Sequence, residues 1–182
     1  MFFNWLPLYY KETFHMSLAG AGFSGTFMLQ MAATVGVLTG GYFSDRVARR
    51  ALRGRMLFGA VCYLAAAPFL LVFLVRPAYA LVSASLALFA FFRALGSLTE
   101  PTITCDLLDT RLRSTALALM NTANCLAGGI GVMLAGYLKR YFGLGGIFAG
   151  VSVIMFVVAG LVLVGYLFFL QRDLARRTGV IA

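Results

Sequence analysis

Arg93 stands out because its charged side chain lies within an apolar stretch, residues 78–102, that is long enough to cross a bilayer. An ionisable group inside a membrane span is costly and by default indicates a functional site. A planar guanidinium can donate two parallel hydrogen bonds to a carboxylate, which lysine cannot reproduce. We therefore predict that Arg93 faces a central cavity and binds an anionic small molecule. The structural alternative is a salt bridge to an acid on a missing half of the protein, or hydrogen bonds to Asn121 or Asn124 across the bundle.

Other polar residues in apolar segments are candidates for the same binding site. Asn121 and Asn124 lie one turn apart on a shared helix face, and Gln30 lies in the middle of another segment. Neutral amides also join helices to each other within membranes, which is the alternative interpretation. Glu100, near the end of the Arg93 segment, is a candidate proton carrier, and a solvated carboxylate is the alternative.

The sequence predicts no cofactor, metal or enzyme activity. Cys62, Cys105 and Cys125 show no CxxC or CxxH spacing, so neither a metal site nor a redox pair is indicated. Residues 22–25 (GFSG) match the GxSG of intramembrane serine proteases, which need a later histidine to activate the serine. The only histidine, His15, precedes that serine. The sequence also lacks a Walker loop, an HExxH motif and an EF-hand pattern.

The overall composition indicates a membrane protein. Of 182 residues, 62% are hydrophobic and 12% are charged, with a mean hydropathy of +0.92, whereas soluble domains are about 25% charged. A soluble domain of this length could not bury so much apolar surface. The composition excludes a soluble enzyme, a disordered chain, a disulfide scaffold and a nucleic-acid-binding module. The net charge of +9 is therefore attributed to cytoplasmic loops and not to a nucleic-acid partner.

The apolar segments predict an all-α fold, a polytopic membrane bundle of six transmembrane helices in one domain. The expected helices cover about 1–14, 18–43, 55–75, 78–102, 114–138 and 144–171. The first helix would reach only ~21 Å across ~30 Å of hydrocarbon, so we expect it to be truncated. Two GxxxG pairs, Gly36 with Gly40 and Gly146 with Gly150, predict close helix packing.

The basic residues predict the orientation of the bundle. Ten lie in loops on one side of the membrane: Arg46, Arg49, Arg50, Arg53, Arg55, Arg111, Arg113, Arg172, Arg176 and Arg177. Four lie on the other side: Lys11, Arg76, Lys139 and Arg140. The positive-inside rule places the side with ten in the cytoplasm. The basic loop 44–54, the tail 172–182 and both termini are then cytoplasmic, in the inner or plasma membrane of the cell.

Residues 41–50 (GYFSDRVARR) end the second expected helix and carry a single acid among arginines. The acid, Asp45, can pair with Arg46 or Arg50, and Gly41 permits close approach of another helix. The spacing resembles the loop motif of the major facilitator superfamily, G-x-x-x-D-R-x-G-R-R, with alanine in place of the second glycine. This resemblance implies that these four residues control gating by latching the cytoplasmic side in the outward-open state.

Two further stretches look like organic-anion symporters of the same superfamily. Residues 5–10 (WLPLYY) resemble the seventh helix, so Trp5 and Tyr9 become candidate substrate-binding residues. Residues 109–116, followed by a polar and glycine-rich helix, resemble the loop between helices ten and eleven.

The resemblance covers the whole chain but only half of the family's twelve-helix unit. It implies the C-terminal half of the unit, with the N-terminal half missing. Residues 93–101 somewhat resemble a fourth helix, which keeps an N-terminal half open as the alternative.

The predicted function is secondary active transport of a small solute by alternating access. The resemblance and Arg93 favour an organic anion such as a sugar acid, and the coupling ion is a proton or sodium. The substrate of such transporters binds near the bilayer midplane between two repeats. The alternative is a membrane scaffold or receptor without transport, or a small channel formed by self-association.

Overall fold

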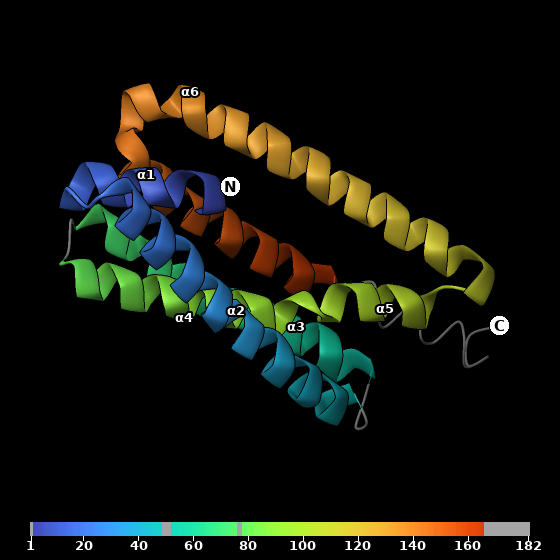
Figure 1. The fold of residues 1–182 in the computed structure, drawn as a ribbon. Coiled ribbons are helices and arrows are strands. Elements are labelled where there is room, and N and C mark those ends of the chain that lie inside the picture. The colour runs from blue at the N-terminus through green and yellow to red at the C-terminus, as the bar shows by residue number, and fades with distance from the viewer. Residues whose placement is uncertain (1, 49–51, 76–77, 166–182) are drawn as a thin grey trace.

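The computed structural model describes residues 2–48, 52–75 and 78–165, and all regular structure in these ranges is helical (Figure 1). The elements are α1 (Phe2–Phe14), α2 (Leu18–Ala48), α3 (Leu52–Ala66), the 3₁₀ helix η1 (Ala67–Leu74), α4 (Tyr79–Ser97), α5 (Thr99–Leu107) and α6 (Thr110–Val164). The prediction of an all-α fold is confirmed.

Several of these helices are suited to a membrane. The described residues contain four stretches that are long and apolar enough to cross one: Leu18–Val47, Gly54–Leu74, Tyr79–Asp106 and Thr110–Val164. At 13 residues, α1 is too short to do so. α6 is not one straight helix, because Gly143 adopts φ 66° and ψ 171°, and the chain reverses there (Figure 1). The number of six spans stays a prediction.

Two segments differ from the sequence-based expectation. The expected loop 44–54 is largely helical, since α2 continues to Ala48 and α3 begins at Leu52. The expected helix 78–102 is interrupted at Leu98. Pro101 lacks an amide hydrogen and so cannot donate to the carbonyl one turn earlier, which explains the interruption. The expected tail 172–182 lies outside the described residues.

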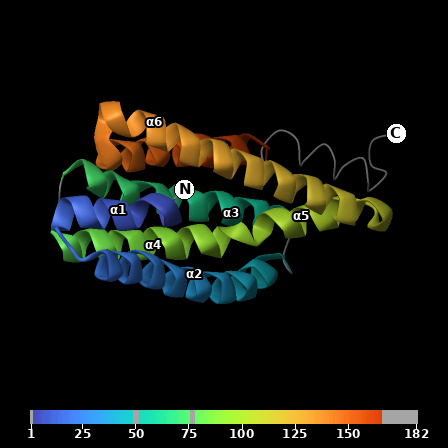
Figure 2. The same ribbon diagram turned by 45° about the horizontal axis from the view of Figure 1, so that its top comes forward.

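The centre of the bundle is α4, which packs between α2 and α3 (Figure 2). A Cβ atom added at Gly36 or Gly40 would lie 2.5 Å from a main-chain oxygen of α4. These two glycines therefore allow α2 and α4 to touch backbone to backbone, as the first GxxxG pair predicted. The second pair makes no comparable contact with another helix among the described residues. A Cβ at Gly146 would meet only its own helix there, and one at Gly150 would meet no described atom within 4 Å.

Polar side chains complete the packing where helices are irregular. The hydroxyl of Ser152, fully buried on α6, donates to the carbonyl of Ala67 at 2.7 Å. This carbonyl lies where α3 gives way to η1, next to Pro68. The Tyr10 hydroxyl and Ser83 Oγ are 3.2 Å apart and join α1 to α4. These bonds satisfy buried polar groups that lipid could not satisfy.

Candidate functional site

A charged cluster at one end of the bundle is centred on Arg55, near the start of α3. Its side chain is only 9% exposed. One terminal nitrogen of the guanidinium donates to Asp45 Oδ1 of α2 at 2.9 Å, and the other donates to Asp106 Oδ2 of α5 at 2.8 Å. A single side chain thus holds the ends of three helices together through charge-assisted hydrogen bonds.

The local geometry of the α2–α3 junction positions this cluster. A Cβ added at Gly54 would lie 2.6 Å from Val47 Cγ1, so the end of α2 and the start of α3 meet closely. This contact brings Arg55 beside Asp45. Of the two pairings predicted as alternatives for Asp45, the one with Arg46 is not formed, because Arg46 is exposed and makes no ion pair with any described residue. The alternative pairing with Arg50 lies outside the described residues.

The two acids of the cluster are not equivalent. The Asp106 side chain is 36% exposed and the Asp45 side chain 72% exposed, so water screens the Asp45 bond more strongly. A buried guanidinium needs such partners, since an unpaired buried charge is strongly destabilising. From the sequence, Arg55 was interpreted only as a basic loop residue, and no role was predicted for Asp106. Arg50, the other predicted gating arginine, lies outside the described residues.

A second polar pair lies where α4 gives way to α5. The buried Tyr63 hydroxyl on α3 donates to Glu100 Oε1 at 2.6 Å. A Cβ at Gly59 would lie 2.5 Å from Thr99 Oγ1, so α3 passes close to this junction and brings the two side chains together. Glu100 remains exposed overall. The pairing was not anticipated, because nothing in the sequence indicates which helix faces Glu100.

Arg93 lies on α4 with an exposed side chain and makes no hydrogen bond or ion pair with the described residues. It lies within electrostatic range of the Tyr63 hydroxyl. The hydrogen bonds to Asn121 or Asn124 that the sequence left open are not formed.

The predicted amide residues are all exposed. Gln30 lies on α2, where its main-chain carbonyl accepts a hydrogen bond from Thr34 Oγ1 at 2.9 Å and its side chain forms no hydrogen bond with a described residue. Asn121 and Asn124 lie on the first limb of α6, the part before Gly143. Every residue from 121 to 130 is exposed there. The described contacts do not join these amides to Arg93.

The two aromatic candidates on α1 are packed inside the bundle. Trp5 contacts the first limb of α6 at Gly136, where an added Cβ would lie 3.2 Å from the indole ring. Its Nε1 is buried without a hydrogen-bond partner among the described residues. Tyr9 is buried against Phe73 and Phe148, with ring centroids 5.1 and 5.6 Å away.

Gly41 does not provide the close helix approach that was predicted for it. An added Cβ there would lie 3.7 Å from Leu98 Cδ1, an ordinary contact. The close approach occurs one residue earlier, at Gly40. The remaining role expected of Gly41, in gating, rests on the resemblance alone.

A family model of the Major Facilitator Superfamily matches residues 1–179, almost the entire chain. The chain belongs to the Major Facilitator Superfamily. No curated protein matches it. Membership indicates an integral, multi-pass membrane protein with transporter activity, in agreement with its apolar helices. The resemblance drawn from residues 41–50 is thereby confirmed at the level of the superfamily.

Proposed function

We propose that this superfamily member transports a small organic anion, such as a sugar acid, by alternating access, as a symporter driven by a proton or sodium gradient. In this proposal the chain is one half of the transporter, the C-terminal one, and the substrate binds between the two halves.

The observation that carries the proposal is Arg93 in the membrane-length stretch Tyr79–Asp106, exposed and without a hydrogen bond or ion pair to any described residue. A guanidinium facing lipid at this depth would be costly, so it needs an aqueous cavity or a partner. A carboxylate substrate supplies that partner with two parallel hydrogen bonds. The neutral amides Gln30, Asn121 and Asn124 are exposed and suited to hydroxyl groups of the same substrate.

The exposed first limb of α6 supports the presence of a second half. Residues 121–130 have no covering element among the described residues, and an added Cβ at Gly128 or Gly129 would meet nothing within 4 Å. Small residues of this kind allow another helix to approach closely.

The Arg55 cluster supports a gate at the expected cytoplasmic face. Its bonds to Asp45 and Asp106 fix the ends of α2, α3 and α5 relative to each other. A bundle whose helix ends are held together moves as one body, as alternating access requires. In this proposal Gly41, Arg46 and Arg50 lie in the same gate.

The hydrogen bond from Tyr63 supports Glu100 as the proton-coupling residue. This bond joins the carboxylate to α3, so a change in the packing of α3 against α5 would break the bond and release the carboxylate.

Binding of a sugar acid to the purified full-length protein, which in this proposal contains both halves, tests the proposal. Arg93→Lys keeps the positive charge but cannot form the paired hydrogen bonds, so glucuronate affinity should fall at least tenfold. Arg111→Lys, an exposed arginine at the start of α6, is the matched control and should bind normally. Circular dichroism and the yield of folded protein are measured alongside. Normal binding by Arg93→Lys, or a loss that only follows lost folded protein, would contradict the anion site.

A further inference from the structure

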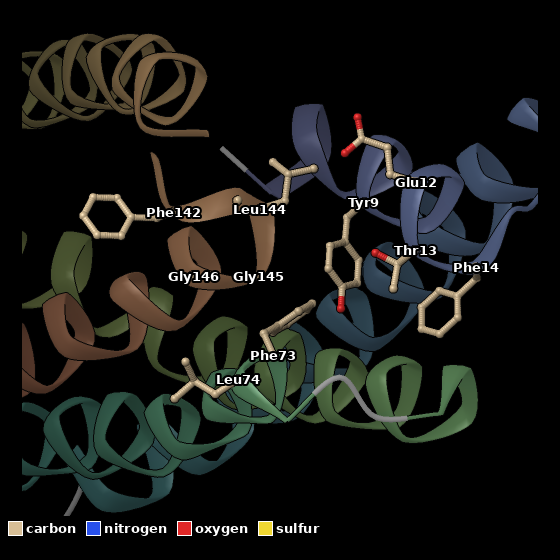
Figure 3. A pocket seen from close by; sticks show the side chains of 11 residues that line it. Tyr9, Glu12, Thr13, Phe14, Phe73, Leu74, Phe142, Leu144, Gly145 and Gly146 are labelled. Carbon is tan, nitrogen blue, oxygen red and sulfur yellow. The ribbon is translucent and has the colours of Figure 1, made fainter. Parts of the chain in front are cut away.

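A cavity of about 700 Å³ lies at the bend of α6, at the opposite end of α3 and η1 from the Arg55 cluster (Figure 3). This volume is in the range of small-molecule binding sites. Figure 3 shows the Tyr9 ring projecting from α1 toward the space between Phe73 and the bend. The function proposed above makes no use of this cavity.

Glycines keep the cavity open on the α6 side. Gly143 has a positive φ that other residues rarely adopt, and it allows the two limbs of α6 to turn back on each other. At Gly145 an added Cβ would lie 3.1 Å from the carbonyl oxygen of Phe73, so the second limb approaches η1 closely. Because glycine has no side chain, Gly143 and Gly145 leave this space open.

The lining of the cavity combines aromatic rings with one carboxylate. The rings belong to Tyr9, Phe14, Phe73 and Phe142, and the carboxylate to Glu12. Tyr9 and Phe73 pack edge-to-face, with ring centroids 5.1 Å apart, and are nearly buried, whereas the exposed Phe142 ring offers its face to the cavity's occupant. The faces of aromatic rings attract cations, and a carboxylate adds to the attraction.

The charge of the lining contrasts with that of the chain. The chain carries a net charge of +9, but the described residues that line this cavity include an acid and no basic residue. Lys139 forms an ion pair with Glu12 and lies outside the lining. The Glu12 side chain remains 46% exposed in this pair, so it is accessible to a second cation.

We propose that this cavity binds an organic ammonium ion with an apolar body, held by the aromatic rings and the Glu12 carboxylate in competition with Lys139. The ammonium group can come from a soluble cation or from a lipid headgroup that carries one.

Calorimetric titration of benzyltrimethylammonium into the purified chain, in nanodiscs of phosphatidylglycerol, tests this site. We expect saturable binding that Glu12→Gln weakens about tenfold and Lys139→Gln strengthens several-fold, because the second change frees the carboxylate. Asp109→Asn removes an exposed acid elsewhere and should change the affinity less than twofold. Circular dichroism establishes that each variant is folded.

The opposite signs of the two main effects make the test specific. If Glu12→Gln and Lys139→Gln both weaken binding, the ion pair only holds α1 against α6 and the proposal is wrong. Absence of saturable binding, or binding that does not depend on Glu12, also overturns it.

Nanodiscs of phosphatidylcholine distinguish the two sources of the ammonium group. If the probe binds more weakly in these discs than in phosphatidylglycerol, and this difference disappears in Glu12→Gln, the lipid headgroup is the occupant. Equal binding in both lipids would identify a soluble cation.

Discussion

Replacing Arg55 with methionine tests whether this residue holds the ends of three helices together. Methionine keeps most of the aliphatic length, so the change removes the charge with little loss of packing. The two carboxylates of Asp45 and Asp106 would then lie close together without the guanidinium between them. The loss of the two charge-assisted hydrogen bonds and the repulsion between the two carboxylates both lower the free energy of unfolding.

The magnitude follows from the exposure of each partner. A hydrogen bond to a charged group contributes about 1.5–3 kcal/mol. The Asp106 bond belongs at the low end, ~1.5 kcal/mol, because its side chain is 36% exposed. The Asp45 side chain is 72% exposed, and an exposed pair contributes only ~0.5 kcal/mol. Arg55→Met should therefore cost about 2 kcal/mol, with Asp106→Asn costing more than Asp45→Asn.

Unfolding in mixed micelles with increasing sodium dodecyl sulfate, followed by circular dichroism, measures these differences. Arg113→Met is the matched control, since Arg113 makes one side-chain hydrogen bond with the described residues, from Nε to the Leu108 carbonyl at 3.2 Å. The control should change the free energy of unfolding by less than ~1 kcal/mol. A neutral Arg55→Met, or an Asp45→Asn that costs as much as Asp106→Asn, would refute the reasoning.

Three further predictions concern packing, topology and coupling. Gly40→Ala places a Cβ 2.5 Å from a main-chain oxygen of α4 and should lower the free energy of unfolding by about 1–3 kcal/mol in the same assay. Gly128→Ala, where an added Cβ meets no described atom within 4 Å, should leave it unchanged or raise it. Equal effects of the two changes would contradict the close α2–α4 contact. In a cysteine-free background, Arg111→Cys should react with an impermeant maleimide only from the cytoplasmic side and Arg140→Cys only from outside, and the reverse pattern would invert the topology. Glu100→Gln should abolish proton-driven uptake while exchange of substrate across the membrane continues, and unchanged proton-driven uptake would remove Glu100 from the coupling mechanism.

The sequence predicted those parts of the fold that depend on local composition. Apolar stretches indicated helices, and the spacing of Gly36 and Gly40 indicated a close contact that occurs against α4. The same spacing at Gly146 and Gly150 did not correspond to a close contact with another described helix, because a GxxxG pair does not reveal whether another helix passes over it. The break at Leu98 was missed, although Pro101 offered a signal for it.

The candidate gate was predicted only in part, because its geometry depends on contacts between distant residues. Asp45 was considered as a partner of Arg46 or Arg50, but the helical ends of α2 and α3 bring Arg55 to it. Asp106 lies 51 residues from Arg55, and no pattern in the sequence relates the two. The same applies to Tyr63 and Glu100, which are 37 residues apart.

Uptake of labelled glucuronate into proteoliposomes tests the central claim, that the chain is half of an anion transporter driven by an ion gradient. The protein encoded by the complete coding region is reconstituted beside the 182-residue chain, with an imposed proton or sodium gradient. The account predicts saturable uptake by the complete protein that collapses when the gradient is dissipated, and no uptake by the chain alone. Uptake that ignores both gradients, non-saturating flux typical of a channel, or full activity of the chain alone would contradict it.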